Sequence, residues 1–129
     1  MTTWLNLAAI ALAGGLGSVC RYVLTIAAAA IPGGSGMLGT TIANVIGCAG
    51  IGALLAYGAV EGNLSDRMSL AIRVGFLGGL TTFSTFAAES AGLASEARWL
   101  SSGLYLAANL FIGWTALILA TTIVKGWMA

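Results

Sequence analysis

The sequence has 129 residues, of which 59% are hydrophobic and 7% are charged, with a net charge of +1, two cysteines and no histidine. Soluble domains contain about 45–50% apolar and about 25% charged residues, so this chain has too few charges to cover a water-exposed surface. The composition excludes a soluble enzyme, a disordered chain, a nucleic-acid-binding protein and a structural zinc site. It predicts an integral membrane protein.

Four apolar segments follow one another along the chain, separated by charges and turn residues. They cover residues 4–29, 37–59, 68–94 and 99–124. Each exceeds the roughly 20 residues that an α-helix needs to cross hydrocarbon, and each is apolar around its whole circumference. Most of the 19 glycines lie inside these segments, as expected where helix backbones approach closely. We therefore predict a single all-α transmembrane domain over residues 1–129, with four membrane-spanning helices.

The basic residues are divided almost evenly between the two sides of such a four-helix arrangement. The side with both termini has Arg67, Arg73 and Lys125, and the other side has Arg98 and, near its helix end, Arg21. Orientation follows the excess of Lys and Arg, and three against two is close to no excess. The count leaves two alternatives open: insertion in both orientations, or a single orientation determined by one arginine.

Polar residues form a stripe on the second segment and another on the fourth. Asn44 lies in the middle of the second segment with Thr40 one turn before it, and Asn109 lies in the fourth segment with Tyr105 one turn before it. The i, i+4 spacing places each pair on one helix face. Hydrogen bonding between helices would explain a single asparagine. Two stripes beside a third polar element favour a polar track through the membrane.

The third segment contains the densest polar cluster, GGLTTFSTF at residues 78–86. Glycines followed by two β-branched threonines are poor helix formers, so we expect the helix to break around Gly79–Phe83. Free backbone groups at membrane depth are tolerated only where they are buried in protein, line a cavity or bind an ion. The alternative is a continuous, kinked helix whose Ser and Thr hydroxyls donate to the preceding turn.

Two phenylalanines follow this expected break. Phe83 and Phe86 are spaced i, i+3, so their rings share a side if the helix resumes. Apolar packing would explain them, and so would ring edges that face an anion, because the edge is the positive part of the aromatic quadrupole. Glu89 is the lone acid deep in a segment, one turn after Thr85. A track of uncharged donors without a run of carboxylates suits a small anion.

Three motifs occur together in this chain: GGLTTFSTF at residues 78–86 with Glu89 after it, GGLGSVCRY at residues 14–22, and GTTIANVIG at residues 39–47. They resemble the signature of the fluoride channel family called Fluc or CrcB. The resemblance extends over the whole chain, including its length and four-segment layout.

The resemblance implies a passive, fluoride-selective channel that exports fluoride across the cytoplasmic (inner) membrane. It implies an antiparallel, dual-topology homodimer with two pores, and a structural sodium ion at its centre, held by the backbone carbonyls of Gly78 and Thr81. It also implies a structural role for Arg21. The pore residues that it implies are Asn44, Phe83, Phe86, Ser84, Thr85, Thr40, Glu89 and Tyr105. We add Asn109 to them, because its amide can donate as a hydroxyl does. The fourth segment departs from the family, which tends to have small hydroxyls where this chain has Asn109 and Gly113.

Two other classes of membrane protein share some of these features. A small multidrug exporter also has four spans, but would need an acid in its first segment to couple protons to a cationic drug, and this segment has Arg21 instead. A structural subunit that packs against other membrane proteins would explain the glycines, but not the hydroxyl-rich cluster in the third segment. Neither alternative explains as much of the sequence as a fluoride channel.

Overall fold

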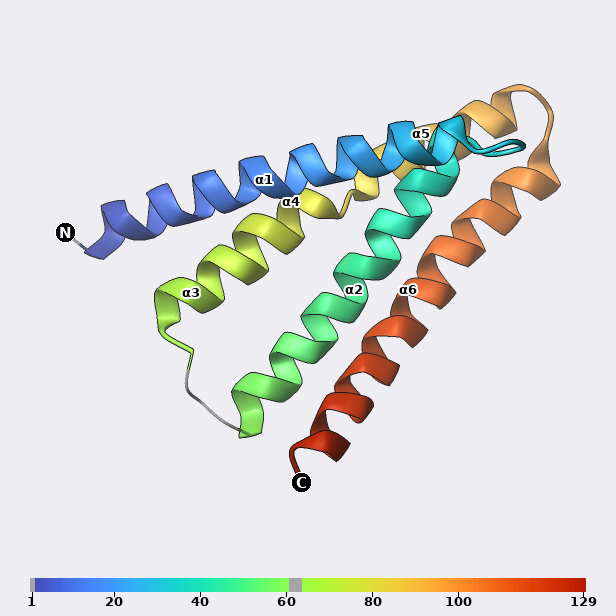
Figure 1. Ribbon diagram of the computed structural model, residues 1–129. Coiled ribbons are helices and arrows are strands. Elements are labelled where there is room, and N and C mark those ends of the chain that lie inside the picture. The colour runs from blue at the N-terminus through green and yellow to red at the C-terminus, as the bar shows by residue number, and fades with distance from the viewer. Residues whose placement is uncertain (1, 61–63) are drawn as a thin grey trace.

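A computed structural model describes residues 2–60 and 64–129, so residues 61–63, which belong to the connection expected between the second and third apolar segments, lie outside the described part. The described residues form helices joined by short connections (Figure 1). In chain order the helices are α1 (Thr2–Ala30), α2 (Gly36–Val60), α3 (Asp66–Leu70), the π-helix η1 (Ala71–Leu77), α4 (Gly78–Leu80), α5 (Phe83–Ser95) and α6 (Trp99–Trp127).

Four helical stretches are long and apolar enough to cross a membrane: Thr3–Ala30, Gly36–Ala59, Asp66–Ser95 and Trp99–Trp127. The prediction of an all-helical integral membrane protein with four such helices is confirmed. No stretch has more than 28% of its most apolar part buried inside the protein chain. Most of the apolar surface must therefore be covered by lipid or by another protein chain.

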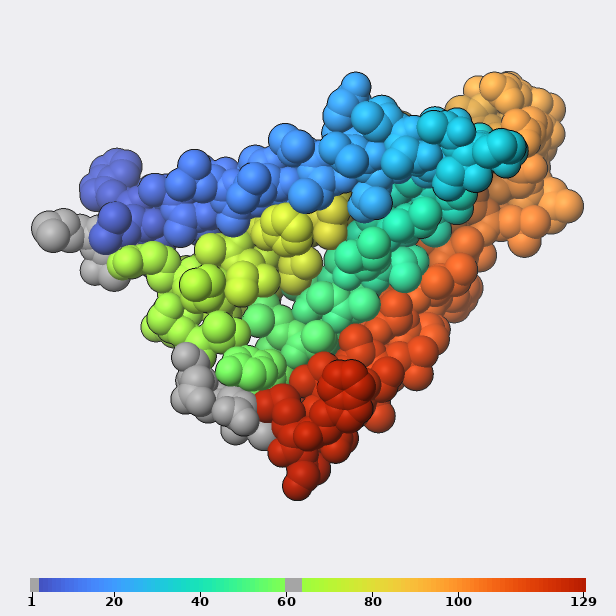
Figure 2. Space-filling model, viewed as in Figure 1, coloured from blue at the N-terminus to red at the C-terminus, as the bar shows by residue number. Residues whose placement is uncertain are grey.

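The chain forms an open wedge rather than a closed bundle. Figure 1 shows α2 and α6 side by side, while α1 diverges from α2 with distance from their connecting turn. The segment from α3 to α4 packs along α1. The space-filling view has a correspondingly triangular outline (Figure 2).

Glycines allow α1 to lie directly against the third membrane segment. Gly17 faces the backbone of Phe76 and Leu80, and a Cβ at Gly17 would lie 2.9 Å from the Leu80 nitrogen. Gly79 faces the backbone of Gly14 in the same way. Close backbone approach through small residues is the usual packing mode of membrane helices. These contacts position the first residues of the cluster at 78–86.

We expect Gly17→Ala to destabilise the folded protein by about 1–3 kcal/mol, because the new methyl group would overlap backbone atoms that cannot rotate away. Gly15→Ala is the matched control, since a Cβ at Gly15 meets nothing within 4 Å. Thermal unfolding of the two purified variants in the same detergent measures the difference. Equal melting temperatures for both variants would contradict this packing of α1.

Helical geometry is interrupted between α4 and α5. Thr81 (φ −81°, ψ 152°) and Thr82 (φ −149°, ψ 113°) have extended backbones. The Thr82 side chain then caps α5, because its Oγ1 accepts a hydrogen bond from the Thr85 N–H at 3.2 Å. The π-helix that precedes α4 was not expected from the sequence, because wider helical turns have no clear residue signature.

Candidate functional site

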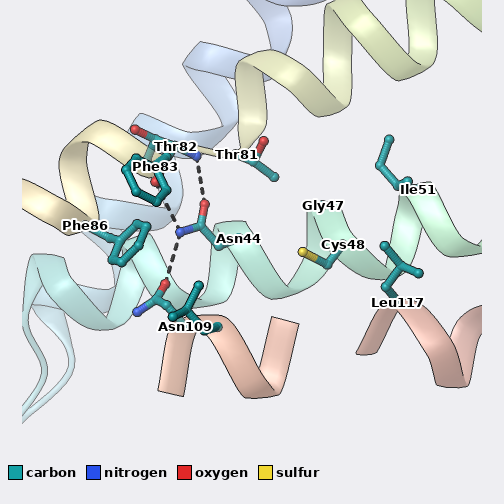
Figure 3. A pocket seen from close by; sticks show the side chains of 11 residues that line it. Asn44, Gly47, Cys48, Ile51, Thr81, Thr82, Phe83, Phe86, Asn109 and Leu117 are labelled. Atoms are coloured by element: carbon teal, nitrogen blue, oxygen red, sulfur yellow. Dashed lines mark hydrogen bonds between the residues drawn. The ribbon is translucent and has the colours of Figure 1, made fainter. Parts of the chain in front are cut away.

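A pocket of about 290 Å³ lies where α2 and α6 meet the extended Thr81–Thr82 link (Figure 3). Five of its lining residues belong to the predicted site: Asn44, Thr81, Phe83, Phe86 and Asn109. Its remaining lining residues are Gly47, Cys48, Ile51, Thr82, Leu110 and Leu117. One part of the pocket wall is therefore polar and aromatic, while the part lined by Ile51 and Leu117 is apolar.

The Asn44 carboxamide pairs with the Thr82 peptide group in the polar part of this pocket. Asn44 Oδ1 accepts from the Thr82 N–H at 2.7 Å, and Asn44 Nδ2 donates to the Thr82 carbonyl at 3.2 Å (Figure 3). The same Nδ2 donates to Asn109 Oδ1 at 3.0 Å. Both N–H groups of Asn44 thus have protein acceptors. This side chain replaces the helical partners that the interrupted backbone has lost.

Asn109 joins the two polar stripes predicted on α2 and α6. Its Nδ2 donates to Thr41 Oγ1 at 3.1 Å and to the Tyr105 carbonyl at 3.1 Å. Thr41 in turn donates to the Met37 carbonyl one helical turn earlier. The sequence analysis did not select Thr41. Its position three residues before Asn44, one turn away on α2, is the signal that could have indicated it.

A second polar cluster brings together Thr40 of α2, Glu89 of α5 and Tyr105 of α6. Thr40 Oγ1 donates to Glu89 Oε1 at 3.1 Å, and the Tyr105 hydroxyl donates to Glu89 Oε2 at 2.5 Å. Within the described part of the chain, the only ion pair joins Arg98 and Glu96 in the α5–α6 turn. Glu89 therefore has hydroxyl donors as its neighbours, rather than a cation.

The two phenylalanines lie between the outer surface of the protein and this second cluster. Phe83 is 74% exposed and Phe86 is 5% exposed. Their rings meet edge to face, with centroids 4.8 Å apart and planes at 87°. Phe86 also contacts the Tyr105 ring edge to face, at 6.5 Å. Phe86 therefore lies between the pocket and the Glu89 cluster, with Phe83 beside it at the surface.

The hydroxyls after the interruption form a small network around Thr82. Thr82 Oγ1 donates to Thr85 Oγ1 at 2.9 Å, and Ser84 Oγ lies 3.5 Å from Thr82 Oγ1. Ser84 is exposed and Thr85 is half-buried, and neither lines the pocket. The structure thus places these two predicted site residues at the start of α5, outside the pocket itself.

The chain matches the family described as CrcB-like protein, Camphor Resistance (CrcB), over residues 8–121. It belongs to the CrcB family. A relative from Rhodopirellula baltica, named "Fluoride-specific ion channel FluC", is 37% identical over 144 residues, covering 98% of this chain and 99% of that protein. Proteins of the same name from Roseiflexus sp. and Nitratidesulfovibrio vulgaris are 36% and 42% identical, covering 94% and 81% of this chain and 98% and 84% of their own lengths.

In this CrcB-family chain the interruption frees two backbone carbonyls of their usual donors. A continuous α-helix would direct the Thr82 N–H to the Gly78 carbonyl, but this N–H donates to Asn44 instead. It would likewise direct the Thr85 N–H to the Thr81 carbonyl, but this N–H donates to Thr82 Oγ1. These are the two carbonyls that the sequence analysis assigned to sodium. Oxygen atoms of unwound backbone are suitable ligands for Na⁺.

Arg21 satisfies a third carbonyl at the interruption. Its Nε donates to the Gly79 carbonyl at 3.2 Å, and so joins α1 to α4. The arginine thereby supports the polypeptide just before the extended link. Sequence reasoning expected a structural role for Arg21 but could not identify this partner, which lies 58 residues away in the chain.

Proposed function

We propose that this chain forms a passive, fluoride-selective ion channel that exports fluoride from the cytoplasm. The proposal rests on a continuous row of uncharged polar groups and aromatic rings that extends from the pocket to the Glu89 cluster, in a chain of the CrcB family. The names of its relatives support fluoride as the transported ion. The names of these relatives and the family match do not favour the two alternatives, a small multidrug exporter and a structural subunit.

Fluoride is a small anion that holds its water strongly, so a selective path must replace that water with closely spaced donors. A strong cation in the path would trap the ion, and conduction requires binding that is favourable but readily reversed. The proposed pore donors are uncharged hydroxyls, amides and ring edges. The residues that would contribute them are Asn44, Phe83, Phe86, Ser84, Thr85, Thr40, Tyr105 and Asn109, with Glu89 hydrogen-bonded to Thr40 and Tyr105. The Asn44 and Asn109 amides donate to protein acceptors, which a passing ion would have to replace.

The proposed location is the cytoplasmic (inner) membrane. Acid outside a cell converts fluoride to HF, which crosses lipid and dissociates inside. A passive pore then allows the membrane potential, negative inside, to drive the anion out. This route requires neither ATP nor a coupled proton, and so no soluble domain.

Fluoride efflux from liposomes that contain only this protein tests the proposal. Fluoride and chloride electrodes record release from vesicles loaded with both salts, after valinomycin is added to compensate the charge. We expect rapid fluoride release with no matching chloride release. Fluoride release no faster than from protein-free vesicles, or equal release of both ions, would contradict the proposed function.

We also propose that two subunits assemble as an antiparallel homodimer, with two pores that each use residues of both chains. The exposed ring of Phe83 and the exposed hydroxyl of Ser84 support this arrangement, because a pore wall needs an opposing surface. The near-balance of Lys and Arg between the two sides supports insertion in both orientations.

Dual insertion predicts that a cysteine added at the C-terminus is labelled from both sides of the membrane. Cys20→Ala and Cys48→Ala provide a background without native thiols. A membrane-impermeant maleimide applied outside intact cells should label about half of the molecules, and the other half only after permeabilisation. Labelling from one side alone would contradict dual topology. Three additional lysines at one terminus should bias insertion and deplete the dimer.

A structural sodium ion is the third element of the proposal. The freed carbonyls of Gly78 and Thr81 from each subunit would hold it at the dimer centre, and the ion would satisfy oxygens that a break in a membrane helix leaves without donors. A bound cation there would also add positive potential close to an anion path. The interruption between α4 and α5 would thus provide backbone carbonyls that bind a cation at membrane depth.

Sodium removal is expected to lower the thermal stability of the assembled protein. We expect protein purified in N-methyl-D-glucamine buffer to melt at a lower temperature than protein in sodium buffer, because ligand binding to the folded state alone stabilises it. Sodium titration should restore the melting temperature with saturation, while equal concentrations of N-methyl-D-glucamine should not. Identical melting curves in both buffers would contradict a structural sodium site.

A further inference from the structure

The orientation of the Asn44 carboxamide decides whether the Thr82 peptide has partners. Thr82 N–H requires an acceptor and the Thr82 carbonyl requires a donor, and only one orientation of Asn44 provides both. The terminal torsion of an asparagine side chain has a broad energy minimum, so the side chain alone does not fix this orientation. Besides the Thr82 peptide itself, one other group contacts the Asn44 carboxamide and constrains its orientation.

Asn109 is that group, and its own orientation is fixed from two directions. The Tyr105 carbonyl can only accept, and so requires Asn109 Nδ2 at its side. Thr41 uses its hydroxyl hydrogen on the Met37 carbonyl, so its oxygen also faces Asn109 as an acceptor. Both constraints direct Asn109 Oδ1 toward Asn44, where it accepts at 3.0 Å.

We infer that Asn109 is a positioning residue, which holds the Asn44 carboxamide in register with the Thr82 peptide. In this arrangement Asn109 of α6 orients Asn44 of α2, and Asn44 in turn holds the peptide group of the extended link. The link in turn sets where α5 begins, and so where Phe83 lies. The expected loss of fluoride flux rests on the proposed channel function. The expected orientation of Asn44 depends only on the hydrogen bonds described above.

Asparagine side-chain resonances provide a test that does not depend on transport. The chain contains no glutamine, so its side-chain amides are those of Asn6, Asn44, Asn63 and Asn109. In ¹⁵N-asparagine-labelled protein, the Asn44→Ser spectrum assigns the Asn44 NH₂ pair. Asn109→Leu removes the acceptor with little change in volume, so we expect one Asn44 NH₂ proton to shift upfield, as for a broken hydrogen bond.

Two further variants separate positioning from general disruption. Asn109→Asp retains an oxygen acceptor for Asn44 and should leave both Asn44 protons close to their original shifts. Thr122→Val is the matched control on the exposed face of α6, where the hydroxyl donates only to the Ile118 carbonyl. If Asn109→Leu yields no folded protein, Thr41→Val tests the same series of hydrogen bonds, because it removes one of the two groups that orient Asn109.

Unchanged Asn44 resonances in Asn109→Leu, or in Thr41→Val where the first variant does not fold, would overturn the inference. Equal loss of the Asn44 hydrogen bond in Asn109→Asp and Asn109→Leu would also overturn it. In liposomes we expect Asn109→Leu dimers to lose about tenfold in fluoride flux. If wild-type protein fails to conduct fluoride while the resonances behave as expected, the proposed function fails and the positioning role stands.

Discussion

Phe83→Ile and Phe86→Ile are each expected to reduce fluoride flux by at least about a hundredfold, equivalent to about 2.7 kcal/mol in the transport barrier. Isoleucine keeps much of the apolar volume of phenylalanine but has no ring edge to present to an anion. The two rings meet at 4.8 Å, so either substitution also removes the edge-to-face contact that orients the other ring. Fluoride efflux from liposomes measures the effect.

The structure supplies the controls for this experiment. Phe111 is 68% exposed on α6 and lines a different surface, so Phe111→Ile should leave the flux unchanged. Phe86 is buried, so its substitution also reduces folding stability, and flux must be compared between equal amounts of dimer verified by size-exclusion chromatography. Normal flux in both Phe83→Ile and Phe86→Ile proteins would show that the two rings only pack and do not contact the transported ion.

Asn44→Asp is expected to abolish fluoride conduction in protein that still assembles. The change keeps the shape of the side chain but removes the N–H groups that face the Thr82 carbonyl and Asn109 Oδ1. The part-buried Thr82 carbonyl and the buried Asn109 Oδ1 then lose their donor, at a cost of up to about 1–3 kcal/mol each, and an ionised carboxylate in the pocket would repel an anion. Both effects act against transport.

The comparison that decides the role of Asn44 is between stability and flux. If Asn44 only ties helices together, its loss should reduce stability by about 0.6–2 kcal/mol and reduce transport only in proportion to the protein lost. Asn6→Asp is the matched control, because Asn6 accepts from Arg67 at an exposed end of the subunit. Asn44→Asp dimers that conduct at the original rate would exclude Asn44 from the pathway.

Local spacing in the sequence predicted a polar stripe on each of two helices. Residues four apart share a helix face, so Thr40 with Asn44 and Tyr105 with Asn109 had to form stripes once α2 and α6 were helical. Burial of two amides in an apolar chain then required them to find partners, and the nearest polar stripe was on the other helix. The contact between Asn44 and Asn109 satisfies that requirement.

Contacts that depend on tertiary packing could not be predicted in this way. The partner of Arg21 is a carbonyl made available by the interruption, and the partner of Asn44 is the Thr82 peptide group. Neither backbone group differs in the sequence from any other peptide unit. The glycines predicted close packing, but only the structure shows that Gly17 and Gly79 are among the positions where α1 contacts the backbone of the third segment. The separation of Ser84 and Thr85 from the pocket likewise follows from where α5 begins.

The reversal potential of the current in a planar lipid bilayer tests the central claim most directly. A bilayer containing the purified protein separates two chambers with equal chloride and pH and a tenfold fluoride gradient. A passive fluoride-selective channel should give a reversal potential of about 59 mV, the Nernst value for one charge, and a tenfold chloride gradient alone should give none. A reversal potential near zero under the fluoride gradient, or one that follows pH or chloride, would contradict the account.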